Sequence, residues 1–353
     1  MTTLPAGVTA VREAHRVDEA ALRDWLAQTL GLRGELQIAQ FEGGQSNPTY
    51  FLQIGGERLV LRRKPPGKLL PSAHAVDREF RVISALHGST VPVAEALALC
   101  SNEQIIGSLF YVMRHVEGRV FWDPKTPSLT PGERAAVFDD MNRVIAALHG
   151  LDPDALGLGD YGPREAYLNR QIVRWSKQYH AAEAPAIEAM ERLIAWLPQH
   201  VPPDDDLRIV HGDLRLDNFI FHPTEPRVLA LLDWELSTLG DPLVDFAYSA
   251  LTWRMPGGGF RGLAGVDIAA LGIPSEAEYV ARYCARSGHP LAVDGTMPHW
   301  NTYLVFNLFR LAAILQGVAA RARQGNAASE QAVAMGQQAR PLAEAAWQLA
   351  QGA

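Results

Sequence analysis

Two short segments of the sequence decide the expected fold: His211-Gly212-Asp213-Leu214-Arg215-Leu216-Asp217-Asn218 and, further on, Leu231-Leu232-Asp233-Trp234-Glu235. The residues between them predict a hairpin, because a short apolar run follows Asn218, a turn with two prolines comes next, and a second apolar run leads to Asp233. If the hairpin folds near Glu225 and Pro226, Asn218 and Asp233 lie opposite each other at its open end, about 5 Å apart. Two hard oxygen ligands at that separation could share one octahedral cation such as Mg²⁺.

The spacing of Asp213 and Asn218 indicates phosphoryl transfer. That reaction needs a carboxylate to orient the acceptor hydroxyl and oxygen ligands to hold Mg²⁺, and here Asp213, Asn218 and Asp233 supply them. Either Asp213 or Asn218 alone would be explained more simply as a turn residue. The joint pattern, with His211 before it, favours a phosphotransferase site. Asp217 is next to Asn218, and we expect its side chain to point elsewhere.

Composition excludes several other classes of protein. The chain has 353 residues, a length that is enough for two lobes with separate cores. Its residues are 48% hydrophobic and 20% charged, which is ordinary for a soluble globular protein. A formal net charge of −7 argues against a nucleic-acid-binding protein. Cys100 and Cys284 form no C-x-x-C pair and fit a reduced cytoplasm. The N-terminus lacks a signal pattern, and no uncharged, uniformly apolar window of about 18 residues predicts a membrane span.

Periodicity predicts an α+β protein in three parts. Residues 1–29 form an arm and a helix that ends at Gly31, residues 30–116 form a mostly antiparallel sheet with one helix from Ser72, and residues 117–353 are mainly helical. Capping boxes begin two of the later helices, at Thr130 and Ser275. The other expected elements are strands over 36–41, 49–54, 58–63, 94–100 and 109–115 and helices over 301–322 and 329–351, with a loop at 254–265.

The chain resembles a known family at this point. It is similar to the aminoglycoside phosphotransferase and choline kinase-like group over roughly residues 30 to 320. The likeness is closest to the branch fused to, or encoded near, acyl-CoA dehydrogenases. The segments that carry it are Gly44-Gln-Ser-Asn-Pro-Thr-Tyr50, Val60-Leu-Arg-Arg-Lys-Pro-Pro-Gly67, Ala73-His74, Asp77-Arg-Glu-Phe80 and Tyr111-Val-Met113.

The resemblance implies a two-lobed protein kinase-like fold that binds ATP and Mg²⁺. It assigns Asp213 as the catalytic residue and Asn218 and Asp233 as metal ligands. Gly44, Ser46 and Asn47 become candidates for nucleotide contact, because glycines let backbone N–H groups approach phosphates. A simple hairpin turn explains these three residues equally well.

The residue that grips the phosphates departs from the family pattern. The family usually has a Lys on the third strand, paired with a Glu on the next helix. Here Arg62 holds the matching position and Glu79 is the expected partner. Arg keeps the charge but brings a planar fork. Lys64 lies on the same strand face and could act instead. Both basic residues could also simply end a strand.

The resemblance places the hinge that contacts adenine at Met113-Arg114-His115-Val116. The backbone of the last three residues should hydrogen-bond the base, so side-chain identity matters little there. Position alone supports this assignment.

Residues around the predicted centre are given supporting roles. His211 and Asp245 are expected to brace the catalytic loop, and Asp241 to cap a helix that begins at Pro242. Trp253 and Arg254 are candidates to line the acceptor site, although most such aromatic residues belong to a core. A metallohydrolase built on His211, Asp213 and His222 is a weaker reading, because a third clustered nitrogen ligand is missing.

The expected function is an ATP- and Mg²⁺-dependent kinase, cytoplasmic, that phosphorylates the hydroxyl of a small molecule. The resemblance suggests a hydroxyacyl or CoA-linked acceptor and a functional link to enzymes of acyl-CoA metabolism. An aminoglycoside is not the default acceptor, because the acidic cluster that a polycation needs is not evident. Neither a nucleic-acid nor a membrane partner is expected. The alternative is a nucleotide-binding pseudokinase scaffold, and nothing supports flavin oxidation.

Overall fold

The computed structural model describes residues 5, 7–42, 47–65, 75–182, 185–203, 206–292, 295–323 and 335–352. Its backbone contacts divide the chain into two compact units. Unit 1 comprises Met1–Arg119 and Asn218–Ser237, and unit 2 comprises Val120–Asp217 and Thr238–Ala353. Each unit is described by itself below.

Unit 1 contains an antiparallel sheet of six strands in the order β1-β2-β3-β4-β6-β5. The expected strands are confirmed, with ends that differ by one or two residues. A short edge strand, β1, pairs with β2 in the N-terminal arm. The strands are β1 (Val8–Thr9), β2 (Gln37–Phe41), β3 (Thr49–Ile54), β4 (Glu57–Arg63), β5 (Ala96–Cys100) and β6 (Phe110–Arg114).

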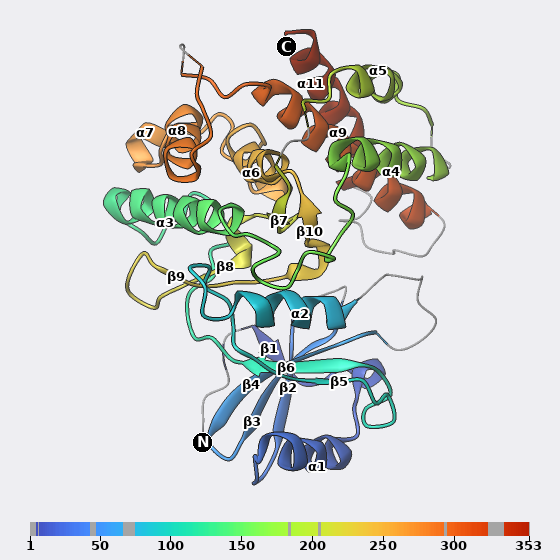
Figure 1. Cartoon of the computed structure of the whole chain (residues 1–353), viewed down its shortest axis with the longest axis vertical. Coiled ribbons are helices and arrows are strands. Elements are labelled where there is room, and N and C mark those ends of the chain that lie inside the picture. Colours follow the sequence, from blue (N-terminus) through green and yellow to red (C-terminus); the bar gives the residue numbers. More distant parts are fainter. Residues whose placement is uncertain are drawn as a thin grey trace. The chain divides into compact units, whose positions relative to one another are not determined.

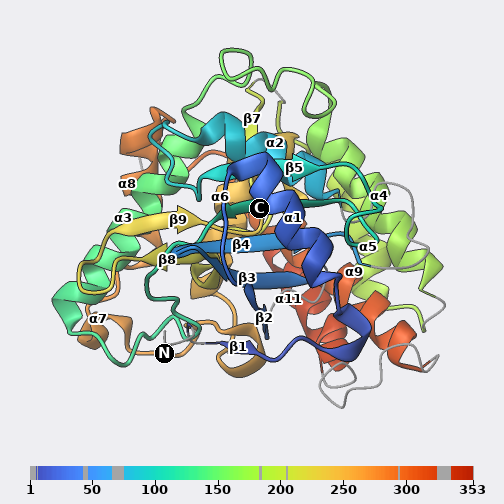
Figure 2. The ribbon, with the colours of Figure 1, turned by 90° about the horizontal axis from the view of Figure 1, so that it is seen from below.

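Two helices cover opposite faces of this sheet (Figure 1). Helix α1 (Glu19–Leu30) is capped by the Asp18 carboxylate and ends at Gly31 in the left-handed conformation, as expected. Its Leu22 and Leu26 pack against one face of the sheet, and Figure 2 shows α1 lying across the strands. Helix α2 (Val76–Leu86) lies on the other face. Because side chains alternate along a strand, Arg62 of β4 points toward α2.

The predicted hairpin forms, and it belongs to unit 1. Strands β8 (Phe219–Phe221) and β9 (Val228–Leu231) pair antiparallel. Arg119 and Phe221 exchange two backbone hydrogen bonds, and the Leu231 N–H donates to the Pro92 carbonyl. These bonds join the hairpin to the N-terminal sheet unit, so the compact units are not consecutive stretches of the chain.

The register of the hairpin corrects one prediction. Asn218 lies opposite Leu232, whose N–H donates to the Asn218 carbonyl at 2.8 Å, and not opposite Asp233. The His222 N–H donates to the Arg227 carbonyl, so the turn is centred one residue earlier than expected. The irregularity between Ile220 and Phe221 then shifts the pairing by one residue back toward the expected register. Asp233 is therefore one residue beyond the last backbone pair.

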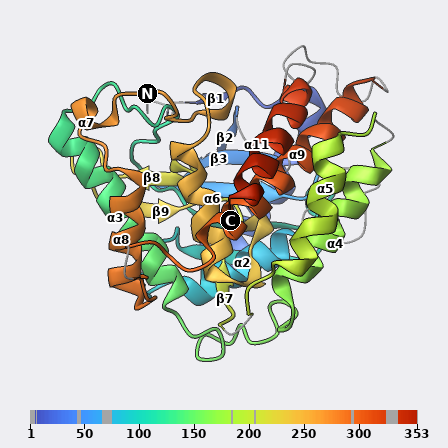
Figure 3. The same cartoon turned by 90° about the horizontal axis from the view of Figure 1, so that it is seen from above.

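Unit 2 is built from helices around a two-stranded ribbon of β7 (Arg208–Val210) and β10 (Thr238–Gly240). Both predicted capping boxes are present, at Thr130 and Ser275. Helices α3 and α8 lie side by side, and so do α9 and α11 (Figure 3). The helices are α3 (Pro131–His149), α4 (Tyr167–Ala181), α5 (Glu188–Trp196), α6 (Pro242–Ala250), α7 (Ile268–Leu271), α8 (Glu276–Ser287), α9 (Trp300–Arg323) and α11 (Ala339–Gln351).

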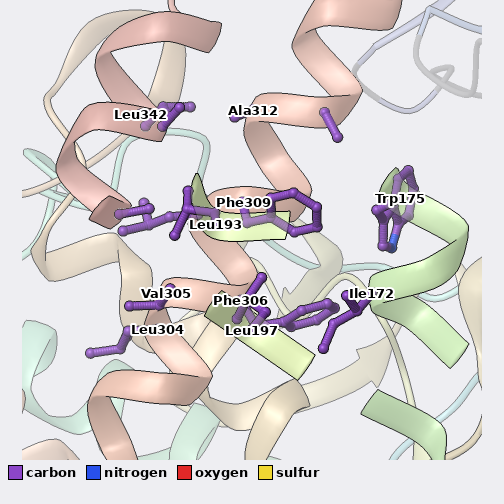
Figure 4. Packing of buried hydrophobic residues seen from close by; sticks show 14 of the residues in the cluster. Ile172, Trp175, Leu193, Leu197, Leu304, Val305, Phe306, Phe309, Ala312 and Leu342 are labelled. Carbon is purple, nitrogen blue, oxygen red and sulfur yellow. The ribbon is translucent and has the colours of Figure 1, made fainter. Parts of the chain in front are cut away.

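Helix α9 forms the centre of unit 2. Its Phe306 and Phe309 pack among side chains from α4, α5 and α11, including Trp175 and Leu193 (Figure 4). By length and hydropathy alone, Trp300–Ala320 could cross a membrane, but 72% of that window is buried in the protein. It is the core helix that its nearly uniform apolarity predicted. The expected helix starts at Ser72 and Ser329 lie outside the described residues.

Candidate functional site

Arg62 and Glu79 form the expected ion pair. Arg62 Nε lies 3.0 Å from Glu79 Oε2, and the side chains are only 11% and 1% exposed. Strand β4 and helix α2 carry them, so the pair joins the sheet to its covering helix. Lys64, the alternative, makes no ion pair with any described residue.

Arg62 also faces two carboxylates that follow the hairpin. Its Nη2 lies 3.0 Å from Asp233 Oδ1 and 3.8 Å from Glu235 Oε2. One guanidinium therefore lies within ion-pair distance of three carboxylates. Burial alone would lower the pKa of Arg62, but Glu79 and the other anions raise it, so Arg62 keeps its charge. We call Arg62, Glu79, Asp233, Glu235, Asn47 and Tyr111 the Arg62 cluster.

Asn47 and Tyr111 complete this cluster. The buried Asn47 amide donates to Glu79 Oε1 at 2.9 Å and to Glu235 Oε2 at 3.3 Å, and Tyr111 donates to Glu79 Oε2 at 3.2 Å. Burial raises the pKa of Glu79 to about 7; Arg62 opposes this rise, and Asp233 and Glu235 add to it. Gly44 and Ser46, the other nucleotide candidates of this turn, lie outside the described residues.

Asn218 and Asp233 lie at the same end of the hairpin. Asp233 adopts the left-handed conformation at φ 64°, which is uncommon for a residue other than glycine and is typical of functional sites. Among the described residues, no group of three or more His, Cys, Asp or Glu is arranged to hold a metal. An amide and a carboxylate nevertheless fit Mg²⁺, which takes few protein ligands and completes its shell with phosphates and water. The Arg62 guanidinium on Asp233 already marks this carboxylate as a cation partner.

The predicted hinge residues are engaged in the sheet more than expected. Arg114 N–H donates to the Glu95 carbonyl at 2.9 Å, and His115 N–H donates to the Arg58 carbonyl at 3.0 Å. These two donors are therefore used by neighbouring strands. The Val116 N–H makes no hydrogen bond to a described residue. Met113 lies within β6 and is buried.

The loop that carries Asp213 is braced by Asp245 of helix α6, within unit 2. The carboxylate of Asp245 accepts hydrogen bonds from the His211 N–H at 2.6 Å and the Gly212 N–H at 2.8 Å. His149 Nε2 lies 3.2 Å from the same carboxylate, and its Nδ1 is 2.8 Å from the Tyr283 hydroxyl. Burial alone would raise the pKa of Asp245, but His149 and the loop lower it overall.

Asp213 is held from two sides. Its N–H donates to His211 Nδ1 at 3.2 Å, and its Oδ1 accepts from the Tyr248 hydroxyl at 2.8 Å. Burial raises the pKa of Tyr248, so this hydroxyl keeps its proton and acts as a donor. Arg310 donates to the Gly212 carbonyl at 2.7 Å and lies over the Tyr248 ring. The Asp213 side chain is 25% exposed, and Arg215 Nε lies 4.0 Å from its Oδ1.

Asp217 binds two arginines. Arg215 Nε donates to its Oδ1 at 3.1 Å, and both Arg215 Nη2 and Arg261 Nη1 contact its Oδ2. Arg261 in turn lies 4.6 Å from the centre of the Trp122 ring. Asp217 is thus committed to partners in unit 2, whereas Asn218 begins the hairpin of unit 1.

Trp253 and Arg254 are bound within unit 2. The Trp253 indole donates to the Pro274 carbonyl at 2.7 Å, and its ring packs against Phe138 and Tyr279. Arg254 makes a two-point contact with the Glu276 carboxylate. These contacts are those of a core aromatic residue and a surface ion pair. The acceptor-lining role stays a prediction.

Sequence reasoning missed several residues near the predicted centre. Glu235 stands two residues after Asp233 and had a visible signal, since it shares the short acidic segment. Arg310 had one too, because it is the single charge in the apolar stretch from 300 to 320. Tyr248 and His149 had none, because only the tertiary fold brings them to Asp213 and Asp245. Arg261 lies in the glycine-rich 254–265 segment, which forms a short 3₁₀ helix at Gly258–Phe260.

Comparison with known sequences places the chain in a family. A family model described as the phosphotransferase enzyme family matches residues 37–294. Acyl-CoA dehydrogenase family member 10 of Mus musculus is 45% identical over 344 residues, which cover 96% of this chain. The match covers 32% of the mouse protein, so this chain corresponds to about a third of that relative.

Comparison with solved structures agrees with the sequence match. A crystal structure of a candidate aminoglycoside phosphotransferase from Ralstonia eutropha is 50% identical, with a TM-score of 0.87, and the match covers 96% of this chain and 99% of that one. Aminoglycoside phosphotransferase APH(4)-Ia, in complex with ADP and hygromycin B, is 15% identical with a TM-score of 0.60. The match covers 93% of this chain and 98% of that one. At that identity the likeness shows a common kinase-like fold. The chain belongs to the phosphotransferase enzyme family.

Proposed function

We propose that this protein transfers the γ-phosphoryl group of ATP to the hydroxyl of a small molecule. The observation that carries the proposal is the setting of Asp213, a partly exposed carboxylate on a loop fixed by Asp245. A kinase needs such a carboxylate held still beside an acceptor, because positioning accounts for much of its catalysis.

Asp213 orients the acceptor hydroxyl and receives its proton. The acceptor oxygen forms a bond to the γ-phosphorus, the bond from that phosphorus to the β,γ-bridging oxygen breaks, and ADP leaves with the electron pair. Tyr248 donates to Asp213 Oδ1 and thereby fixes the direction in which the carboxylate presents its other oxygen. His211 and Arg310 keep the loop backbone in position.

Asn218 and Asp233 would hold Mg²⁺, and Arg62 would orient the phosphates. When bound, the metal neutralises the charge that develops on the phosphate oxygens. Support comes from the hard oxygen donors at the end of the hairpin and from the buried Arg62–Glu79 pair. Glu79, Tyr111 and Asn47 keep the guanidinium in one orientation.

A hydroxyacyl compound, free or linked to CoA, is the acceptor that we propose. The support is the likeness to acyl-CoA dehydrogenase family member 10, of which this chain matches about a third. A hydroxyacyl kinase beside an acyl-CoA dehydrogenase would act on related carbon chains. We propose the cytoplasm as its location. Flavin oxidation is no part of the proposal, because the family model that matches residues 37–294 is that of a phosphotransferase.

One observation favours a rival function. Arg62 stands where related kinases have Lys, and it contacts Asp233 directly. A protein in which this contact persists would bind nucleotide without transferring phosphate and would serve as a scaffold.

An ADP-release screen separates the two functions. The full chain is incubated with ATP and Mg²⁺ over hydroxylated metabolites, including hydroxyacyl-CoA thioesters, with Asp213→Asn and Asp233→Asn as controls. We expect acceptor-dependent ADP release that falls at least about a hundredfold in kcat in Asp213→Asn, while ATP still binds. Asp233→Asn should lose a similar factor and raise the Mg²⁺ concentration needed. ATP binding without turnover on any acceptor, unchanged by Asp213→Asn, would contradict the kinase and favour the scaffold.

A further inference from the structure

We propose that Arg261, Arg215 and Trp122 form a subsite in unit 2 that binds an anionic group of the acceptor, and that Asp217 holds the two arginines ready for it. The inference rests on the proposed function and specifies the chemical class of its substrate. The three side chains lie around the loop from Asp213 to Asp217.

The two arginines of this subsite differ in their partners. Arg215 contacts Asp217 and also lies 4.0 Å (Nε) from Asp213 Oδ1, whereas Arg261 meets no described carboxylate other than the Asp217 group that it shares with Arg215. Asp217 is 8% exposed, whereas Arg215 is 46% and Arg261 is 37% exposed. The positive groups therefore face solvent and the negative group lies beneath them. An incoming carboxylate or phosphate would give Arg261 a second anionic partner through charge-assisted hydrogen bonds.

Arg261 has donors to spare. It donates from Nη1 to Asp217, and no other described residue accepts its remaining N–H groups. A guanidinium carries five N–H donors in a planar fork that matches carboxylate and phosphate oxygens. Arg261 thus combines a fixed position with unused donors beside the catalytic loop.

Trp122 adds an apolar surface to this charge. At 57% exposure it is the most exposed of the large apolar side chains that the structure describes, and Arg261 covers part of its ring. An exposed tryptophan beside an arginine suits a ligand with a charged group next to a hydrocarbon or a flat ring. A polycationic acceptor would instead meet repulsion from both arginines.

Another Arg–Trp pair of unit 2 shows what a balanced arrangement looks like. Arg192 pairs with Glu188 on helix α5 and lies 5.7 Å from the centre of the Trp347 ring on α11. One arginine there meets one carboxylate, with no excess charge. It offers a matched control for substitutions in the proposed subsite.

The acceptor's anion could come from two sources with shared chemistry. A free hydroxy acid offers its carboxylate, and a CoA thioester offers the phosphates of CoA. The test therefore uses 2-, 3- and 4-hydroxybutyrate, each as the free acid, the neutral amide and the CoA thioester, in ADP-release assays on the full chain. Calorimetric titration with CoA alone measures phosphate binding without turnover.

Two substitutions should act in opposite directions. Arg261→Gln should lower the preference for a charged acceptor over its amide at least about tenfold in kcat/KM, because charge-assisted hydrogen bonds are lost. Asp217→Asn should raise that preference, because it removes the internal anion that competes with the ligand. Arg192→Gln should leave the preference unchanged.

The outcomes separate the subsite from the kinase. A fall with the free acid only assigns the carboxylate as the anion, and a fall with thioester and CoA assigns the phosphates. Unchanged selectivity and unchanged CoA binding in Arg261→Gln, in a protein whose turnover depends on Asp213, would overturn the subsite alone. Weaker CoA binding in Arg261→Gln without turnover on any acceptor would support the subsite and contradict the kinase.

Discussion

Two groups of arginines and carboxylates in this protein have opposite stoichiometry. In unit 1, one buried arginine, Arg62, faces Glu79, Asp233 and Glu235. In unit 2, two exposed arginines share the carboxylate of Asp217. In the first group the Arg62–Glu79 pair is shielded from water, whereas Asp233 and Glu235 are 35% and 24% exposed. In the second group both arginines are open to water, and Arg215 also lies 4.0 Å from Asp213 Oδ1.

The difference teaches which ligand each group suits. A carboxylate as buried as Glu79 is costly unless a cation joins it, and Arg62 is that cation, so the Arg62 cluster keeps this guanidinium charged and in place for the phosphates that we propose. Exposed guanidinium groups stay hydrated and can exchange one partner for another, so the Asp217 group suits the anionic ligand that we propose. The same residue types therefore serve different roles because their ratio and burial differ.

The largest expected effect comes from removing the arginine of each group in turn. Arg62→Gln should lower the free energy of unfolding by about 3 to 5 kcal/mol at pH 7, because it leaves the buried Glu79 carboxylate without a cation. Arg261→Gln should cost less than about 1 kcal/mol, as for an exposed ion pair. Urea denaturation of both variants measures the contrast.

Arg62→Lys sharpens this first comparison. It keeps the charge but loses the planar fork that reaches Glu79 and Asp233 together, so its loss should lie between those of wild type and Arg62→Gln. Equal losses in Arg62→Gln and Arg261→Gln would mean that burial does not distinguish the two groups.

The second prediction concerns the pH dependence of stability. Burial raises the folded-state pKa of Glu79 to about 7, from an unfolded value near 4.5. The contribution of Glu79 to the free energy of unfolding is therefore fully present below pH 4.5 and is lost as the pH rises through 7. The loss should be on the order of 3 kcal/mol at most. Glu79→Gln, which cannot ionise, should flatten this decline in urea midpoints measured from pH 5 to 8. A decline as steep in the variant as in wild type would assign it to other groups.

The smallest expected effect concerns Tyr248. Tyr248→Phe removes the donor to Asp213 Oδ1, and a hydrogen bond to a charged group contributes about 1.5 kcal/mol, so kcat should fall roughly tenfold. The KM for ATP should not change, because Tyr248 contacts the proposed catalytic carboxylate of Asp213 and not the Arg62 cluster. A larger change in KM for ATP than in kcat would place the role of Tyr248 elsewhere.

Local signals were enough to predict most of the secondary structure. Asp18 and Gly31 bound α1, and Thr130 and Ser275 begin their helices with capping boxes, because each of these devices acts within a few residues. Pairings across the chain were less secure. The hairpin formed, but its turn is centred one residue earlier than expected, so Asn218 lies opposite Leu232.

The candidate site was only partly visible in the sequence. The pairing of Arg62 with Glu79 followed from position in the expected fold. Nothing in the sequence indicated that Arg62 would also contact Asp233, or that Asn47 would bridge two carboxylates. Side chains such as these meet only when a loop, a strand, a helix and a hairpin from distant parts of the chain are packed together.

The sequence by itself determined the elements, the family resemblance and the identity of the charged residues, because capping, periodicity and motif spacing are local properties. The tertiary structure alone decided how the charges meet: three carboxylates around Arg62, and two arginines on the shared carboxylate of Asp217. Electrostatic energy depends on distance and burial, and neither is written in the order of residues.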